Sequence, residues 1–340
     1  MIWIKNIFIV LFSTLIALVI SEIFLRIIDI GYSNSPLERS STYHHVNPSD
    51  YHFLMYETYE EYGGHYVYYD NLGFRVPTKT SSTTQKASEE KAIIFLGDSF
   101  TLGNQLPHNE LFSSLVSEEL NLASLNFGVS SYSPLLYELQ TQNIVSQFDA
   151  DVVILQIYSN DFRGDESYLE DAVFDGNTII GIDGGENNLL VKIVRYFYLA
   201  RLIRKSQLLL QTILSNPNDT VQMSSSAFDF EQNVTDEQMQ NTVQIIKRIH
   251  TNLTEQGKKL YVFLIPSKSL SLANECCSND ALYSRLYSEL AKIHVDTIDI
   301  KSFFEQINNQ HELFFQQDIH LTASGHRVLA SSIVSQLKNN

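Results

Sequence analysis

The sequence is poor in cysteine. Its 340 residues include only two, Cys276 and Cys277, and these are adjacent. A single adjacent pair is neither a disulfide framework nor a zinc-ligand pattern, both of which need separated cysteines. We interpret the two residues as ordinary thiols in a loop, with a strained vicinal disulfide as the alternative.

Positive charge is also scarce. The chain has 23 Lys and Arg against 39 Asp and Glu, which gives a formal net charge of -16. Nucleic-acid binding needs clustered Lys and Arg, so the composition argues against a nucleic-acid partner. It also disfavours strongly anionic polymers as substrates. The histidines near residues 44–65 show no spacing typical of a metal site, and we predict neither a metal nor a cofactor.

What the sequence does contain is a long uncharged run at its N-terminus. Residues 6–21, "NIFIVLFSTLIALVIS", carry no charge, and residues 1–28 are predicted to be a membrane anchor because a spanning helix needs roughly 20 residues. A cleaved signal peptide is disfavoured, since no small-residue cleavage site follows; a buried core helix is the other alternative. Lys5 before the run, and Glu22 and Asp29 after it, predict an orientation with the rest of the chain outside the cytoplasm.

Residues 29–90 are interpreted as an extension and linker. Tyrosine is abundant between Tyr43 and Tyr69, and "DNLGFR" follows at residues 70–75. Dense aromatic side chains either stack on sugar rings or pack a small hairpin-rich region against a larger domain, and packing is favoured. Residues 78–90 are polar without periodicity and are predicted to be a linker.

The main domain is predicted to cover residues 91–340, with an insertion at about 162–236. Short apolar runs alternate with longer stretches of helical spacing, which predicts an α/β fold with a parallel sheet covered by helices on both faces. The predicted strands are Ala92–Leu96, Leu122–Phe127, Val152–Ile157, Leu260–Ile265 and Val295–Ile300. The predicted helices between and after them are Leu111–Leu120, Leu135–Val145, Met239–Leu253, Leu282–Ile293 and Ala323–Leu337.

Residues suited to catalysis follow these strands. "GDS" at residues 97–99 ends the first strand, Gly128 follows the second, Asn160 follows the third, and "DIH" at residues 318–320 precedes the last helix. In such sheets ligands bind beyond the carboxyl ends of the strands. We therefore expect these residues to converge at one edge of the sheet.

The residue types fit nucleophilic catalysis. Ser99 is a weak nucleophile until a base removes its proton, and His320 is the predicted base. Asp318 would hold the imidazole in the correct tautomer and stabilise its charged form. The backbone N–H groups of Ser99 and Gly128 and the side-chain amide of Asn160 are the predicted oxyanion-hole donors.

Each motif also has a structural alternative. Asp98 and Asp318 are typical helix-capping or turn residues, and Asn160 could belong to a loop that caps a helix. The order and positions of the motifs together favour the catalytic interpretation. His326 is a poorer candidate for the base, since it would lie inside the last helix.

The four blocks "FLGDSF", "LNFGVSSYS", "IYSNDF" and "DIHLTASGH" resemble those of the SGNH, or GDSL-type, hydrolases. The resemblance covers residues 91–160 and 254–338. It implies a flavodoxin-like three-layer α/β/α domain, a Ser99 nucleophile, a His320–Asp318 pair, and an oxyanion hole completed by Gly128 and Asn160. The N-terminal helix, "SEIFLRII" and "NLGFR" are similar to the membrane-anchored bacterial branch of this family.

Two positions depart from the usual family pattern. Phe100 stands where the shorter motif has leucine, and we expect it to be buried behind the nucleophile. The late pair is Asp-x-His instead of the commoner Asp-x-x-His, a spacing similar to that of the O-acetyltransferase relatives that act on alginate and cell-wall polysaccharides. This spacing extends the expected reaction class from hydrolysis to acyl transfer.

The insertion contains two further features. "AVFDGNTIIGID" predicts a hairpin with an Asp-Gly-Asn turn. Leu189–Leu214 predicts one helix with five Lys and Arg and no acid. Either this helix is a cap beside the active site, which we favour, or it lies on an anionic membrane surface.

The predicted function is a serine esterase that removes O-acyl groups, most simply O-acetyl, from an envelope carbohydrate or a related ester. The alternatives are a polysaccharide O-acetyltransferase and a non-catalytic envelope assembly protein that keeps the fold. An intact Ser99, Asn160 and His320 set argues for an enzyme.

Overall fold

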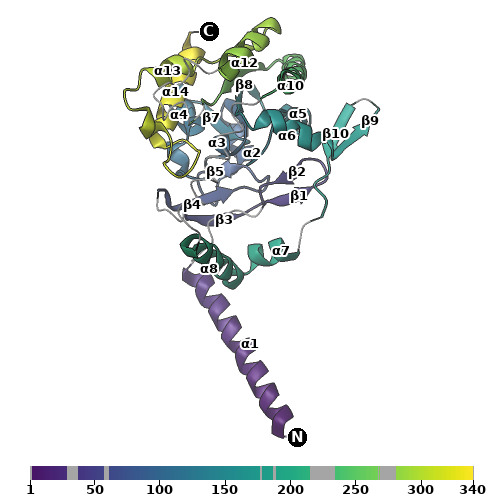
Figure 1. The fold of residues 1–340 in the computed structure, drawn as a ribbon, viewed down its shortest axis with the longest axis vertical. Helices are drawn as coiled ribbons and strands as arrows, with labels where there is room; N and C mark the ends of the chain where they lie inside the picture. Colours follow the sequence, from purple (N-terminus) through teal and green to yellow (C-terminus); the bar gives the residue numbers. More distant parts are fainter. Residues whose placement is uncertain are drawn as a thin grey trace.

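The computed structural model describes residues 2–28, 37–56, 61–176, 178–186, 189–214, 234–266, 268 and 281–339. The cysteine pair at 276–277 lies outside these residues. A central sheet with helices on both faces forms the body, and helix α1 extends away from it (Figure 1). The α/β class is confirmed.

The central sheet has eight strands in the order β12-β11-β8-β6-β7-β5-β4-β3. Five are parallel: β6 (Ala92–Leu96), β7 (Ala123–Asn126), β8 (Ala150–Ile157), β11 (Lys259–Leu264) and β12 (Asp296–Thr297). They correspond to the five apolar runs of the sequence. Successive residues of β6 enter opposite cores, Ile94 and Leu96 on one face and Ile93 and Phe95 on the other. A strand buried on both faces explains its unbroken apolar run.

The predicted parallel strands form the centre of the sheet, and antiparallel strands extend it at one edge. The tyrosine-rich extension adds three antiparallel strands, β3 (His52–Tyr56), β4 (Gly63–Tyr69) and β5 (Arg75–Val76). β5 pairs with β7 through Arg75 and Asn126. The sheet is therefore mixed, and the extension shares it with the main domain; the predicted domain boundaries remain predictions.

Helices cover the sheet on both sides. On the face of Ile94 lie α5 (Pro134–Asn143), α6 (Asp161–Leu169), α10 (Asp236–Glu255) and α12 (Ala281–Lys292). On the face of Ile93 lie α4 (Phe112–Leu120), α13 (Lys301–Glu305) and α14 (Ala323–Lys338). The short helix α3 (Ser99–Leu102) follows β6 directly. All five helices predicted from spacing are present.

The side chains of the tyrosine-rich strands divide between two faces. Phe53, Val67 and Tyr69 are buried and pack with Leu102, which follows the first motif. This confirms the packing interpretation for these side chains. The rings of Tyr66 and Tyr68 stack with each other on the opposite face, 5.9 Å apart between centroids. Sugar stacking by the segment stays a prediction.

The predicted linker was partly wrong, because residues 83–89 form helix α2 (Thr83–Glu89). Its N-cap, Ser82, accepts a hydrogen bond from the Gln85 N–H, and the Thr83 N–H donates to Asp70 Oδ2 at 2.9 Å. Two acceptors at a helix N-terminus satisfy N–H groups that the helix itself leaves unpaired. Asp70, which helps to cap this helix, lies outside the segment that was predicted to be a linker.

Two short antiparallel pairs lie outside the central sheet. They are β1 (Glu38–Ser40) with β2 (His44–Val46), and β9 (Ala172–Asp175) with β10 (Thr178–Ile182). The second confirms the predicted hairpin in the insertion.

The basic segment after this hairpin forms two helices where one was predicted, α7 (Leu189–Tyr196) and α8 (Tyr198–Leu214). α8 starts anew because the Glu22 carboxylate of α1 (Ile2–Ile28) accepts the N–H groups of Tyr198 and Leu199 at 3.1 and 2.9 Å. A carboxylate at this position caps a helix N-terminus. Residues 3–28 are long and apolar enough to span a membrane. Their most apolar 18-residue stretch has a mean hydropathy of 2.6 and is not buried in the protein.

Candidate active site

Ser99 opens α3, separated from the end of β6 by two residues. Its N-cap, Asp98, is buried and accepts the Phe100 N–H at 2.9 Å. Asp98 is therefore the turn residue that the sequence suggested. Burial raises the pKa of Asp98 to about 6, although the Phe100 hydrogen bond and the nearby His320 oppose this rise. The cap holds the Ser99 hydroxyl at the start of the helix, at the carboxyl edge of the sheet.

The three predicted catalytic side chains meet at this point. His320 Nε2 lies 2.7 Å from Ser99 Oγ, and His320 Nδ1 contacts Asp318 Oδ1. Asp318 Oδ1 also accepts the His320 backbone N–H at 2.9 Å. With its proton on Nδ1, the imidazole presents Nε2 as the acceptor for the Ser99 O–H. Ser99 and His320, 221 positions apart in the sequence, are thus joined with Asp318 by a chain of hydrogen bonds.

Asp318 and His320 each stabilise the charged form of the other. Burial would raise the pKa of Asp318, but the charge and hydrogen bond of His320 and the Tyr62 hydroxyl bring it well below its usual range. Burial would lower the pKa of His320, but the charge and hydrogen bond of Asp318, with the charge of Asp98, raise it overall. A charged Asp318 next to a readily protonated His320 is the electrostatic setting of a general base.

Phe100 is buried as expected. Its ring packs against His320 and Tyr158, with centroids 4.8 and 4.6 Å away. The ring therefore shields one face of the imidazole. His326 lies inside α14, buried, where its Nδ1 accepts the Phe112 N–H at 3.0 Å, and burial lowers its pKa to about 3. This confirms that His326 is a core residue.

Asn160 and Gly128 have different surroundings. Asn160 is exposed before α6, and its side chain makes no capping hydrogen bond there. Its amide is thus available at the sheet edge. The Gly128 N–H instead donates to Asn126 Oδ1 at 3.0 Å, so this donor already has an acceptor and its oxyanion role stays a prediction.

Gly128 is needed for packing. A Cβ at Gly128 would lie 2.4 Å from the Leu102 nitrogen and 2.9 Å from its Cα, both backbone atoms of α3. The amide of Asn126 also donates to the Thr101 carbonyl of α3 at 2.7 Å. The exit of β7 therefore lies directly against the helix that carries Ser99, and only glycine fits there.

The tyrosine-rich extension reaches the site, which the sequence did not reveal. The Tyr62 hydroxyl donates to Asp318 Oδ2 at 2.7 Å. The Glu61 carboxylate accepts the N–H groups of Gln316 and Gln317 at 2.8 Å each. Residues 61–62 thus brace the loop that carries Asp318. The density of tyrosine hinted at an important segment, but nothing indicated which tyrosine contacts the acid.

Two buried cations brace the site from other directions. The Lys268 ammonium donates to the carbonyls of Gln316 and Asp318 at 2.7 and 3.0 Å. The Arg75 guanidinium, from the "NLGFR" motif, donates to the carbonyls of Gly103 and Leu106 at 3.1 and 2.8 Å, and burial lowers its pKa to about 10. Both cations fix loops through backbone oxygens, so they set geometry at the site.

Replacing Tyr62 with phenylalanine tests this bracing. Tyr62→Phe should lower kcat by about tenfold to a hundredfold, the range expected for losing one hydrogen bond to a charged group. KM should change little, because Tyr62 contacts Asp318 and not Ser99. The measurement is steady-state hydrolysis of 4-nitrophenyl acetate, with Tyr66→Phe, on the outer face of β4, as the control. Equal kcat for both variants would contradict a positioning role for Tyr62.

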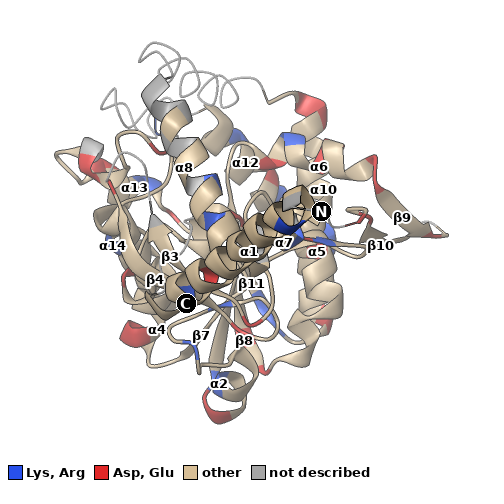
Figure 2. Cartoon of the chain, turned by 90° about the horizontal axis from the view of Figure 1, so that it is seen from below, with Lys and Arg blue, Asp and Glu red and all other residues tan. Residues whose placement is uncertain are grey.

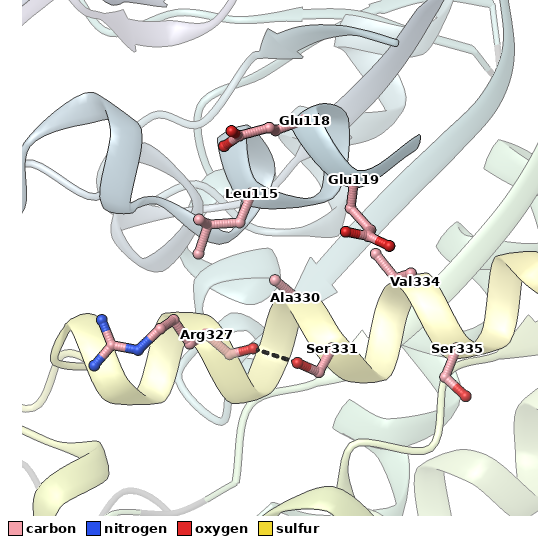
Figure 3. Close-up of a pocket in the computed structure, with 8 residues that line it drawn as sticks. All are labelled: Leu115, Glu118, Glu119, Arg327, Ala330, Ser331, Val334 and Ser335. Carbon is pink, nitrogen blue, oxygen red and sulfur yellow. Dashed lines mark hydrogen bonds between the residues drawn. The ribbon is translucent and has the colours of Figure 1, made fainter. Parts of the chain in front are cut away.

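A surface cavity of about 540 Å³ lies between α4 and α14. Figure 3 shows Leu115, Glu118 and Glu119 on one wall and residues of α14 on the other. Its lining contains neither Ser99 nor His320, so it is separate from the site. Among the described residues, no group of three or more His, Cys, Asp or Glu could hold a metal ion.

Comparisons with solved structures gave distant likenesses only. A G-D-S-L family lipolytic protein from Veillonella parvula is 11% identical, covers 74% of this chain and 100% of its own, and has a TM-score of 0.43. A lipase/acylhydrolase from Enterococcus faecalis is 12% identical, with 73% and 96% covered and a TM-score of 0.40. An acetyl xylan esterase from Geobacillus stearothermophilus is also 12% identical, with 73% and 94% covered and a TM-score of 0.40.

Comparison with family models was more specific. No curated protein matches the chain significantly. Residues 225–340 match the model described as the SGNH hydrolase-like domain of the acetyltransferase AlgX. These residues include the Asp318–His320 pair but not Ser99. Over its C-terminal part the chain is thus similar to the SGNH hydrolase-like family, as the motifs predicted.

Proposed function

We propose that this chain is a serine acyl-transfer enzyme that removes O-acetyl groups from an envelope carbohydrate or a related ester. One observation carries the proposal: Ser99 Oγ lies 2.7 Å from His320 Nε2, while Asp318 holds the opposite ring nitrogen. A nucleophile, a base and an orienting acid in this relation are the requirement for covalent acyl transfer.

The reaction then has two balanced halves. Ser99 Oγ attacks the ester carbonyl while its proton moves to His320 Nε2, and the alcohol leaves with that proton as the acyl-enzyme forms. Water next gives a proton to His320 and attacks the acyl carbon. The acid is released, and Ser99 regains its proton from His320. Asp318 stabilises the imidazolium in both halves without taking its proton.

The oxyanion needs donors near Ser99. We assign this role to the Ser99 N–H, at the start of α3, and to the Asn160 side chain, whose exposed amide makes no capping bond. A helix N-terminus adds a favourable field for negative charge. The Gly128 N–H is left out of this set because Asn126 already holds it.

Asn160→Ala provides a graded test of this assignment. Removing one oxyanion donor should lower kcat by about a hundredfold to a thousandfold. The variant should still react with a fluorophosphonate probe, because Ser99 and His320 are intact. Asp161→Asn is the neighbouring control, since Asp161 is buried and accepts the Tyr158 N–H. If Asp161→Asn were less active than Asn160→Ala, the donor would be misassigned.

A second candidate function is transfer of the acetyl group to a sugar hydroxyl. The match of residues 225–340 to the AlgX acetyltransferase model favours it, as does the Asp-x-His spacing. Transfer and hydrolysis share the Ser99 half-reaction and differ in what attacks the acyl-enzyme. The partly exposed Ser99 is open to water, so hydrolysis remains our first expectation.

One experiment separates the two functions. The purified chain receives an acetyl ester donor with and without short, acetyl-free envelope-type oligosaccharides, and both free acetate and acetylated sugar are measured. Hydrolysis predicts that free acetate is unchanged by the oligosaccharide. A fall in acetate that is matched by acetylated sugar would replace the esterase with the transferase. No turnover in either arm would favour a non-catalytic assembly protein.

We also propose that α1 anchors the protein, with the catalytic domain outside the cytoplasm. The support is the 26-residue apolar helix Trp3–Ile28, which lies apart from the domain core, and Lys5 at its start. The protein should sediment with membranes and resist a salt wash, and a C-terminal reporter should be active only outside the cytoplasm. A reporter active in the cytoplasm would reverse the orientation.

A further inference from the structure

Helices α7 and α8 combine positive charge with exposed apolar side chains, and neither property has a role in the mechanism proposed above. Residues 189–214, here called the collar, contain five Lys and Arg and no acid, in a chain of net charge -16. Large apolar side chains in the collar are also exposed, including Leu190 at 67%, Phe197 at 51% and Leu210 at 56%. A helix that capped a core would bury such side chains.

The collar contacts α1 at a defined position along that helix, near Glu22 and Arg26. The Glu22 carboxylate caps α8 through the N–H groups of Tyr198 and Leu199. Arg26 donates to the Tyr196 carbonyl and pairs with Glu22 at 2.8 Å. Glu22 is the first charged residue after the uncharged run of residues 6–21. The junction of α7 and α8 therefore lies where α1 would leave the apolar part of a bilayer.

The collar is also joined to the catalytic domain. The Arg201 guanidinium is buried and lies over the rings of Tyr198 and Tyr51, 4.4 and 5.0 Å from their centroids. Tyr51 directly precedes β3 of the central sheet. Figure 1 shows α8 between the end of α1 and strands β3 and β4. The collar thus links α1 to the central sheet, and a cap beside the active site stays a prediction.

Charge on the collar is suited to an anionic surface. Figure 2, seen from the side of α1, shows Lys and Arg on α7 and α8 and no Asp or Glu on either helix. Lys192 and Arg204 are exposed. Basic helices with apolar side chains bind in the plane of a membrane interface, with their apolar residues among the lipid chains and their cations at anionic headgroups.

We propose that the collar lies in the interface of the bilayer that α1 spans, with Leu190, Phe197 and Leu210 inserted and with the exposed cations Lys192 and Arg204 at anionic lipid headgroups. The inference rests on the anchoring proposed above. Its consequence is that the catalytic domain is held at one fixed orientation to the membrane, because Arg201 and Glu22 tie the collar to the sheet and to α1. The ligand class is an anionic phospholipid surface.

Tryptophan quenching tests the depth of the collar. The chain has a single tryptophan, Trp3, so Trp3→Phe gives a dark background for Phe197→Trp. The full chain is placed in lipid nanodiscs that contain phosphatidylglycerol and dibrominated lipid. Bromine near the headgroup should quench position 197 by about half, and bromine deep in the chains should quench it less, as expected for interfacial insertion.

A matched control lies on the β9–β10 hairpin. Phe174 is 55% exposed, close to the 51% of Phe197. It belongs to β9, which lies far from α1 in Figure 1. Phe174→Trp should show no lipid quenching. Leu190→Trp is a second probe, used if Phe197→Trp does not fold. Equal quenching at the collar and hairpin positions would overturn the proposal. Collar quenching that depends only on the number of protein chains per disc would also overturn it, because it would indicate that a second copy of the chain contacts the collar.

The charge requirement has its own measurement. Quenching at position 197 should be stronger with phosphatidylglycerol than with phosphatidylcholine alone, and added salt should reduce the difference. Lys192→Glu with Arg204→Glu should abolish this difference, whereas Lys247→Glu, on exposed α10 surface, should not. A difference that persists in the double variant would exclude headgroup binding by these cations.

Failure of this inference can be told apart from failure of the proposed function. Quenching of the natural Trp3 by brominated lipid reports whether α1 is inserted, whatever the collar does. Turnover of 4-nitrophenyl acetate reports the Ser99 site. An inserted, active enzyme with an unquenched collar would refute the collar proposal alone.

Discussion

Ser99→Ala is expected to lower turnover of a small acetyl ester by about a millionfold, the loss seen when a serine nucleophile is removed. Without Oγ there is no atom 2.7 Å from His320 Nε2 that can take up the acyl group. Covalent labelling by a fluorophosphonate should vanish as well. The fold should be retained, because Ser99 is only partly buried and the cap of α3 is supplied by Asp98.

The control for Ser99→Ala removes a serine hydroxyl elsewhere. Ser331 lies on α14, where its hydroxyl donates to the Arg327 carbonyl at 2.9 Å (Figure 3). Ser331→Ala should keep full turnover and labelling. Thermal unfolding of both variants should resemble that of the wild type. Wild-type turnover in Ser99→Ala would refute the whole mechanism, since every later step depends on the acyl-enzyme.

The core of the fold was predictable because its signals are local. A strand such as β6, buried on both faces, needs an unbroken apolar run, and the helices on either side need a regular apolar spacing. Ser99, Asp318 and His320 were predictable for a related reason. Each follows or precedes an element with a clear pattern, and parallel strands bring their carboxyl ends to one edge.

Other contacts could not be predicted, since they depend on tertiary partners. Tyr62 contacts Asp318, which is 256 positions away in the sequence. Nothing in the sequence distinguishes Tyr62 from the neighbouring tyrosines. The break between α7 and α8 is set by Glu22, which lies in α1. The N–H of Gly128 was assigned to the oxyanion because the glycine follows a strand, but the adjacent Asn126 side chain takes it.

Asp318→Asn is expected to lower kcat by about ten-thousandfold, as the loss of the orienting acid does in serine enzymes of this type. Asp318 Oδ1 contacts His320 Nδ1, which keeps the proton on that nitrogen and leaves Nε2 free to accept from Ser99. An amide at position 318 can donate to Nδ1 and so favour the wrong tautomer. The His320 N–H and the Tyr62 hydroxyl should still hold the loop, so the structure should change little.

The pH dependence of Asp318→Asn distinguishes this role from a structural one. In the proposed mechanism His320 acts as a base only when neutral, so activity should rise as pH increases through its pKa. In the wild type, the charge of Asp318 raises the pKa of His320 above its ordinary value despite burial. Removing that charge should shift the acid limb of the kcat/KM profile to lower pH, while Tyr62→Phe should shift it far less. An acid limb that did not move, with residual activity well above the variant's expected level, would show that Asp318 is not the partner of the catalytic base.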